Sequence, residues 1–284
     1  MQIISTQYGD LIPQHTDDDL RKREILPMEY HPSGSIKSVP LERQTTIVTQ
    51  AGELPAELIS FHENGVINRI FPLNGKLSGY WSQEDEAGLA EPITLISPIG
   101  VLTAKFLSVS FYENQSIRSV TLWPGETLSV PTPVGVIETR IGISFTRDGK
   151  VRSLEPAKPT LVKTLAGEMA AFDPDVVGVN GDANSLAFDE SGEVCQVITT
   201  LTKLKVITPD GHTQGFTPEY RDSLCGDTDK EVVPMKVRFN EREVTVQITP
   251  DAGALHLPRA GHVFLAEPYL PQLTHPFGTL RCSI

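Results

Sequence analysis

Cysteine, long apolar runs and positive charge are all scarce in this chain of 284 residues. The three cysteines, Cys195, Cys225 and Cys282, are too few and too scattered for a disulfide framework, which indicates a reducing compartment. No stretch approaches the roughly 18 apolar residues of a membrane span, and the first residues lack the basic and apolar regions of a signal peptide. The sequence therefore predicts a cytoplasmic protein without a membrane partner.

The charge balance is acidic. Lysine and arginine number 24 against 36 aspartates and glutamates, which gives a formal net charge of −12 and a pI near 5.0. A surface of this sign repels the phosphates of nucleic acids and of anionic lipids, so neither is expected as a partner. With 39% hydrophobic and 21% charged residues, the composition is typical of a globular protein.

One block of sequence recurs five times. An aromatic residue is followed by two variable residues, by Asn, Asp or Ser, and by Gly, and aliphatic residues stand six and nine positions after the aromatic. The aromatic residues are Tyr30, Phe61, Phe111, Phe145 and Phe188. Asn-Gly and Asp-Gly tolerate the positive φ of a tight turn, and the flanking segments are rich in Ile, Val, Phe and Thr. Each block therefore predicts a β-hairpin.

Two details of the block lead to further expectations. Gln115 stands at the glycine position of the third copy, where a positive φ costs about 1 kcal/mol, so we expect that turn to differ. Aliphatic residues three positions apart, such as Ile67 and Ile70, do not fit a flat alternating strand. A β-bulge or corner is therefore predicted between them.

A second, looser pattern of apolar strand, glycine and apolar strand accompanies the blocks. Its glycines are Gly52, Gly100, Gly135, Gly167 and Gly211. Together the two patterns predict a repeat of two hairpins, 31–34 residues long between insertions, whose copies bury their apolar faces against each other. The predicted fold is all-β: a repetitive β-hairpin protein, either β-solenoid-like or a twisted open sheet, with atypical end caps. The predicted regions are an N-terminal cap over 1–27, a hairpin repeat region over 28–216 with insertions near 71–92 and 173–185, and a C-terminal β cap with a Pro-rich tail over 217–284.

The hairpin blocks resemble those of a known class of proteins. The segments Phe61-HENG, Phe111-YENQ, Phe145-TRDG and Phe188-DESG look like the hairpin unit of MORN-type repeat proteins. They resemble more closely the MORN-like hairpin-repeat proteins of uncharacterised function from anaerobic bacteria, over roughly residues 28–216. The resemblance implies a repetitive β fold in a bacterial protein and carries no catalytic residues over to this chain.

Aromatic residues near the first insertion form the first candidate site. Trp81 and Trp123 are the two tryptophans, and Tyr80 adjoins Trp81. If stacking of the hairpins brings them to one edge, they could form a platform for a ligand or a partner. The alternative is that both tryptophans are buried in the core or in a cap.

The second insertion and the tail offer polar candidates. Asp182 and Asn184, with Asp173 and Asp175, could bind a ligand or a calcium ion, or could form an ordinary polar loop. Three histidines and a cysteine in the tail could bind zinc, although their spacing matches no standard zinc motif. These four residues are His256, His262, His275 and Cys282. No metal, cofactor or catalytic residue is therefore predicted.

The function predicted from these features is a non-enzymatic cytoplasmic repeat scaffold, or binding protein, for an unknown protein or small ligand. The alternative is an enzyme or metal-binding protein with a site in the 173–185 insertion and the histidine-containing tail. A deep polar pocket with converging acids or histidines would favour the alternative. An exposed aromatic patch would favour the scaffold.

Overall fold

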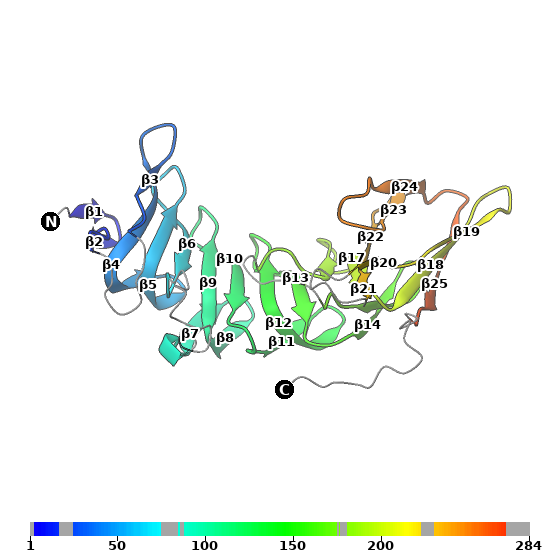
Figure 1. Cartoon of the computed structure of the whole chain (residues 1–284), viewed down its shortest axis with the longest axis horizontal. Helices are drawn as coiled ribbons and strands as arrows, with labels where there is room; N and C mark the ends of the chain where they lie inside the picture. The colour runs from blue at the N-terminus through cyan, green and yellow to red at the C-terminus, as the bar shows by residue number, and fades with distance from the viewer. Residues whose placement is uncertain are drawn as a thin grey trace. The chain divides into compact units, whose positions relative to one another are not determined.

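In a computed structural model of the chain, residues 3–16, 25–74, 85, 88–174, 176, 181–222 and 230–270 are described. The protein is all-β, with 59% of its residues in strands that pair in antiparallel fashion (Figure 1). The chain forms two compact units. Unit 1 comprises Met1–Glu155 and Val176–Asn184, and unit 2 comprises Pro156–Asp175 and Ser185–Ile284. The boundary between the units falls inside the predicted 28–216 region. No helix in the described part of the chain has the length and apolar character of a membrane span.

Unit 1 contains one large antiparallel sheet. Its strands are β3 (Glu29–Tyr30), β4 (Ile36–Thr49), β5 (Gly52–Phe61), β6 (Ile67–Phe71), β9 (Phe106–Phe111), β10 (Ile117–Leu122), β12 (Gly135–Phe145) and β13 (Val151–Pro156), in that spatial order, with β11 (Leu128–Thr132) also paired to β12. Two separate hairpins are β1–β2 (Ile4–Thr6 and Gly9–Leu11) and β7–β8 (Ile93–Ser97 and Gly100–Ala104). Neighbouring strands are thus mostly consecutive in the sequence, as hairpins require.

Unit 2 contains smaller sheets. One has the order β16 (Leu186–Phe188), β17 (Val194–Thr199), β22 (Met235–Phe239), β23 (Glu243–Gln247) and β24 (Leu255–Pro258). Another has β18 (Thr202–Ile207) between β19 (Thr213–Phe216) and β25 (Val263–Pro268). Two further hairpins are β14–β15 (Thr160–Thr164 and Gly167–Ala171) and β20–β21 (Glu219–Asp222 and Lys230–Val233).

The aromatic blocks form hairpins with a common turn. In the Phe61 copy, the amide of His62 donates to the carbonyl of Val66 at 2.7 Å, and the amide of Gly65 donates to the carbonyl of His62 at 2.9 Å. The same pair of bonds occurs in all five copies, and the four glycines have φ between 79° and 89°. Gln115 keeps the same bond to Tyr112 at 2.9 Å and has φ 68°, so the expectation that its turn differs is wrong.

The second glycine pattern forms a different turn. Four of its glycines, Gly52, Gly100, Gly135 and Gly167, have φ between 110° and 118° and lie directly opposite a Thr or Ser three residues earlier. In one example, Thr132 Oγ1 donates to the carbonyl of Gly135 at 2.6 Å and accepts from the amide of Val134 at 3.2 Å. Gly211 was assigned to this class, but its φ of 85° and its bond to Thr208 place it with the aromatic-block turns.

The predicted bulge is present and explains the spacing of the aliphatic residues. In four of the hairpins, the strand after the turn contains one extra residue in its pairing register. The extra residues are Lys37, Asn68, Arg118 and Cys195. Because two residues then occupy the space of one, both flanking aliphatic residues return to the same face, as Ile117 and Val120 show with 3% and 0% exposure.

One face of the unit 1 sheet is the apolar core. Directly paired residues on adjacent strands project to the same side, so a row of mutually paired residues marks one face. The core row is fully buried and consists of Val39, Ile59, Ile70, Val109, Val120 and Ile143. Burial of side chains of this size stabilises the fold by roughly 1.5–3 kcal/mol each.

Candidate functional site

The opposite face of the unit 1 sheet is polar. The row adjacent to the core row pairs small polar residues and one arginine across β4, β5, β6, β9, β10 and β12. Its members are Ser38, Ser60, Arg69, Ser110, Ser119 and Ser144, and Ser144 contacts Ser153 on β13 through their hydroxyls at 2.6 Å. We call this row, together with the bulge residues Lys37, Asn68 and Arg118, the polar face. The bulge places two consecutive side chains on it, which gives a high density of polar groups.

Part of the polar face is covered by the end of the second insertion. The amide of Gly181 donates to Thr121 Oγ1 at 2.9 Å, and Asn184 Nδ2 donates to Ser153 Oγ at 2.7 Å. Ser119 and Ser144 are accordingly only 1% and 3% exposed. A Cβ on Gly181 would lie 2.3 Å from the carbonyl oxygen of Val120, so this approach requires glycine.

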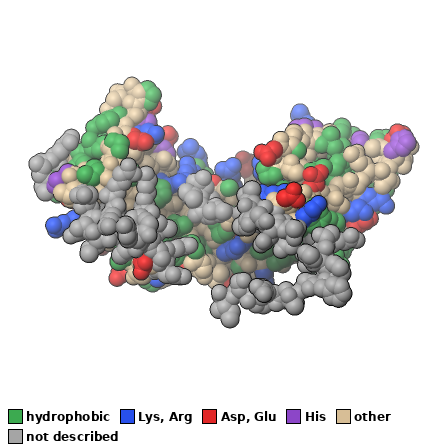
Figure 2. Space-filling model, viewed as in Figure 1, with side chains coloured by type: hydrophobic (Ala, Val, Ile, Leu, Met, Phe, Trp, Pro, Cys, Tyr) green, Lys and Arg blue, Asp and Glu red, His purple; other side chains and the backbone are tan. Residues whose placement is uncertain are grey.

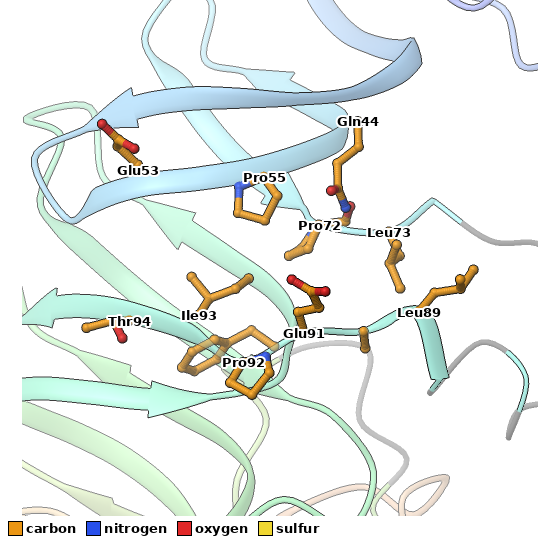
Figure 3. A pocket seen from close by; sticks show the side chains of 12 residues that line it. Gln44, Glu53, Pro55, Pro72, Leu73, Leu89, Glu91, Pro92, Ile93 and Thr94 are labelled. Carbon is orange, nitrogen blue, oxygen red and sulfur yellow. The ribbon is translucent and has the colours of Figure 1, made fainter.

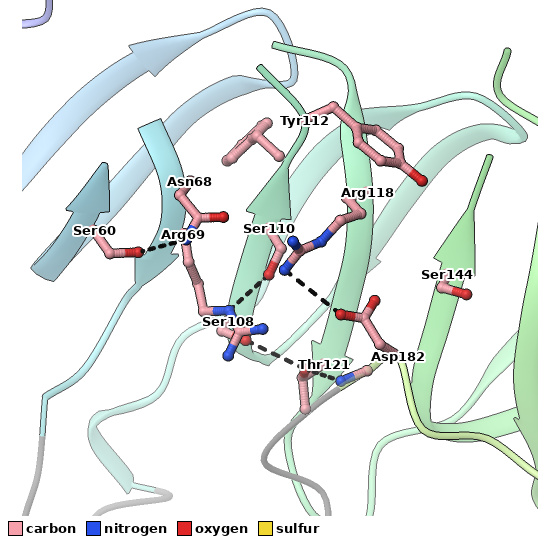
Figure 4. Close-up of polar contacts among 12 residues, drawn as sticks. Ser60, Asn68, Arg69, Ser108, Ser110, Tyr112, Arg118, Thr121, Ser144 and Asp182 are labelled. Carbon is pink, nitrogen blue, oxygen red and sulfur yellow. Dashed lines mark hydrogen bonds and ion pairs between the residues drawn. The ribbon is translucent and has the colours of Figure 1, made fainter. Parts of the chain in front are cut away.

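Two arginines and one aspartate lie beside the covered region (Figure 4). Arg69 Nε donates to Ser110 Oγ at 2.7 Å, and Arg118 Nη2 lies 3.5 Å from Asp182 Oδ2. Burial lowers the pKa of Arg69, the neighbouring charge of Arg118 lowers it further, and Asp182 opposes both effects. The two guanidinium groups are thus close enough to interact, and Figure 4 shows them ending in the same space, between β6 and β10. In the space-filling view, Lys and Arg side chains gather near the β9–β10 turn (Figure 2).

Arg118 is placed by the bulge and has unused hydrogen-bonding capacity. Its side chain is 28% exposed and Asp182 is 41% exposed. Within the described part of the chain, the buried Nε of Arg118 has no hydrogen-bond partner. A guanidinium binds a carboxylate best through two parallel N–H donors, and here only Nη2 faces a carboxylate oxygen.

The structure buries the one residue of the predicted aromatic platform that it describes, Trp123. Trp123 is 7% exposed, and its backbone bonds to Lys105 and Glu126, so its indole is not presented as a platform would require. The burial follows from the position of Trp123 directly after β10, because the last four residues of β10 are themselves buried. Tyr80 and Trp81 lie outside the described residues.

The predicted residues of the second insertion have different roles. Asp182 is exposed, as a ligand-binding residue would be, and it pairs with Arg118. Asn184 is 2% exposed and donates to both Ser153 and the carbonyl of Gly181, so it fixes the covering segment to the sheet. Asp175 lies outside the described residues.

The histidines of unit 2 have ordinary partners. His256 Nδ1 lies 2.9 Å from Glu243 Oε1, and His262 Nδ1 lies 3.2 Å from the carbonyl of Ala260. His275 and Cys282 lie outside the described residues. Over the ranges that the structure describes, no three His, Cys, Asp or Glu side chains gather as a metal site would require.

A pocket of about 510 Å³ lies elsewhere in unit 1, beside β7 (Figure 3). Its lining mixes apolar residues, among them Pro55, Ile93 and Phe106, with polar ones. Gln44 and Glu91 reach toward it from opposite sides, and Gln44 Nε2 donates to the carbonyl of Pro72 at 3.0 Å. Residues 75–84, which follow part of this lining in sequence, lie outside the described part of the chain.

Sequence reasoning missed Arg69 and Arg118, although a signal was present. The residue eight positions after each aromatic is polar in every copy: Ser38, Arg69, Ser119, Ser153 and Gln196. The predicted bulge would have placed the preceding residue on the same side. Pairing across hairpins, which the sequence pattern alone does not provide, was needed to bring both arginines together.

Comparison of the chain with protein-family models, with curated proteins and with solved structures finds no match.

Proposed function

We propose that the protein is a non-enzymatic, cytoplasmic repeat scaffold that binds its ligand or partner on the polar face of unit 1. In this proposal the two kinds of hairpin form one repeat of a MORN-like, solenoid-like or twisted open sheet. The recurrence of two turn geometries and of the bulge supports a repeat. Copies of one hairpin that present equivalent positions side by side form an extended binding surface.

The observation that carries the proposal is the convergence of Arg69 and Arg118 on that face. Two half-buried cations lie together in a protein whose formal net charge is −12. Like charges at close range repel each other, and an anion bound between them would relieve that repulsion. Nucleic acid is not expected as a partner, since the phosphate backbone would meet an acidic surface.

Native mass spectrometry tests this proposal on the full chain. The protein is incubated with a panel of organic acids, phosphorylated metabolites and short acidic peptides, and bound species are recovered and weighed. If the protein is a scaffold, the ligand released from it has the same mass as the ligand that was added. The Arg118→Gln variant should form less of the protein–ligand complex. Recovery of a chemically altered species would contradict the non-enzymatic proposal.

A further inference from the structure

We infer that Arg118, with Arg69 beside it, is a carboxylate-binding site, and that Asp182 is an internal carboxylate that a ligand's carboxylate replaces. The inference deepens the proposed function, because it names the chemical group that the polar face recognises. It is carried by the geometry of the three charged side chains.

The donor edge of Arg118 is only half used. Nε and Nη2 of a guanidinium point the same way and together match the two oxygens of one carboxylate. Asp182 Oδ2 lies 3.5 Å from Nη2, which is longer than the roughly 2.7–2.9 Å of a charge-assisted hydrogen bond. The buried Nε has no hydrogen-bond partner in the described part of the chain. A carboxylate that reached both nitrogens would satisfy a donor that Asp182 leaves unsatisfied.

Charge and attachment both favour exchange of the carboxylate. The cluster holds two positive charges, Arg69 and Arg118, and one negative charge, Asp182. Arg69 is held on the sheet by its bond to Ser110, so its charge stays beside Arg118. Asp182 is 41% exposed, and the attachment of its segment runs through Gly181 and Asn184. The carboxylate can therefore leave Arg118 without loss of either attachment.

Two sources of a carboxylate fit this site: a small organic acid and an acidic side chain of a peptide. Titrations with succinate, with a tetraglutamate peptide and with inorganic phosphate distinguish them, read from the Arg118 Nε–H signal in the NMR spectrum of the full chain. Tighter binding of succinate identifies a small acid as the ligand type. Tighter binding of the peptide identifies a protein partner. Phosphate binding tighter than both would overturn the assignment to carboxylate.

Variants test the role of each charge. Asp182→Asn removes the internal competitor and is expected to tighten carboxylate binding by about two- to fivefold, the range for an exposed ion pair. Arg118→Gln should weaken binding by at least about tenfold, because a charged hydrogen bond is lost. Arg118→Lys keeps the charge without the fork and should also weaken it. Arg242→Gln is the matched control: it removes the same charge from an exposed position of unit 2 and should bind like the wild type.

Two outcomes would overturn the inference. One is an Arg118 Nε–H signal that does not move with succinate or peptide. The other is equal affinity of the wild type and Asp182→Asn, which would show that Asp182 does not occupy the site. Either result leaves the scaffold proposal standing, because that proposal depends on whether a bound ligand is returned unchanged.

Discussion

Gln115 holds a backbone conformation that favours glycine. Its φ of 68° matches the 79–89° of the glycines at equivalent positions, and the turn keeps the same hydrogen bonds. A left-handed conformation costs a residue with a Cβ roughly 1–2 kcal/mol, part of which glycine loses again through its greater freedom in the unfolded chain. The pairing of β9 with β10 therefore outweighs the local preference of Gln115.

Gln115→Gly is expected to raise the free energy of unfolding by about 0.5–1 kcal/mol, measured by chemical denaturation. The reciprocal variant Gly65→Gln should lower it by about 1 kcal/mol. A Cβ on Gly65 would meet no atom within 4 Å, so that loss would report the backbone alone. A Gln115→Gly variant less stable than the wild type would show that the Gln115 side chain makes a compensating contact.

Gly181 tests the contact that covers the polar face. A Cβ there would lie 2.3 Å from the carbonyl oxygen of Val120, so one of the two backbone segments would have to shift. Gly181→Ala should lower the free energy of unfolding by about 1–3 kcal/mol, as overpacking does. Gly253→Ala, whose Cβ would lie in open space, is the control and should change it by less than about 0.5 kcal/mol. Equal stability of the two variants would contradict the close approach.

At the scale of elements, Glu42 on β4 fastens the segment before it. Its carboxylate accepts from the backbone amide of His15 at 2.7 Å and from the hydroxyl of Thr16. These bonds, with the Thr16 hydroxyl first, lower the pKa of Glu42 from 4.5 to about 2. Because the folded-state pKa lies below the ordinary value, the attachment is complete above pH 4.5 and is lost as the pH falls toward 2.

Hydrogen exchange measures this attachment. In the wild type, the amides of His15 and Thr16 should remain protected at pH 5 and lose protection progressively below pH 4. In Glu42→Gln, the amides of His15 and Thr16 should be weakly protected both at pH 5 and below pH 4, since an amide oxygen accepts a hydrogen bond less strongly than a carboxylate. Glu138→Gln, on an exposed side chain of β12 that accepts from the Ser129 hydroxyl, is the control and should leave both amides unchanged. Protection that is independent of pH in the wild type would contradict the role of Glu42.

The elements that the sequence predicted best are those with a local signal. The aromatic-block hairpins, the bulge after the turn in four of them and the hairpin around Asn240 all follow from residues within about ten positions, and all are present. The Thr or Ser that braces the second turn class, as Thr132 does, was a local signal that was overlooked.

The site was not predictable to the same degree. Arg69 and Arg118 lie on strands separated by β9, and Asp182 reaches them from more than 60 positions along the chain. Their meeting depends on register across several hairpins and on the fit of Gly181 against the sheet. Composition and spacing contain neither of these. The aromatic residues are conspicuous in the sequence. They form no site in the described part of the chain, because Trp123 is buried in the core.

At the scale of the whole molecule, the two units present different polar rows. The row of unit 2 runs through Gln196, Arg238, Thr245 and His256. Arg238 Nε donates to Gln196 Oε1 at 2.9 Å. The nitrogen that has no hydrogen-bond partner among the described residues in Arg118 is therefore already bonded in Arg238. We therefore expect the ligand to select unit 1.

Hydrogen–deuterium exchange of the full chain, with and without saturating succinate, tests this claim most directly. If succinate binds at Arg118, protection should increase in β6, in β10 and in the segment around Asp182, and exchange should stay unchanged at the lining of the pocket beside β7 and throughout unit 2. Protection centred on that pocket or on unit 2, with none in β6 and β10, would contradict it.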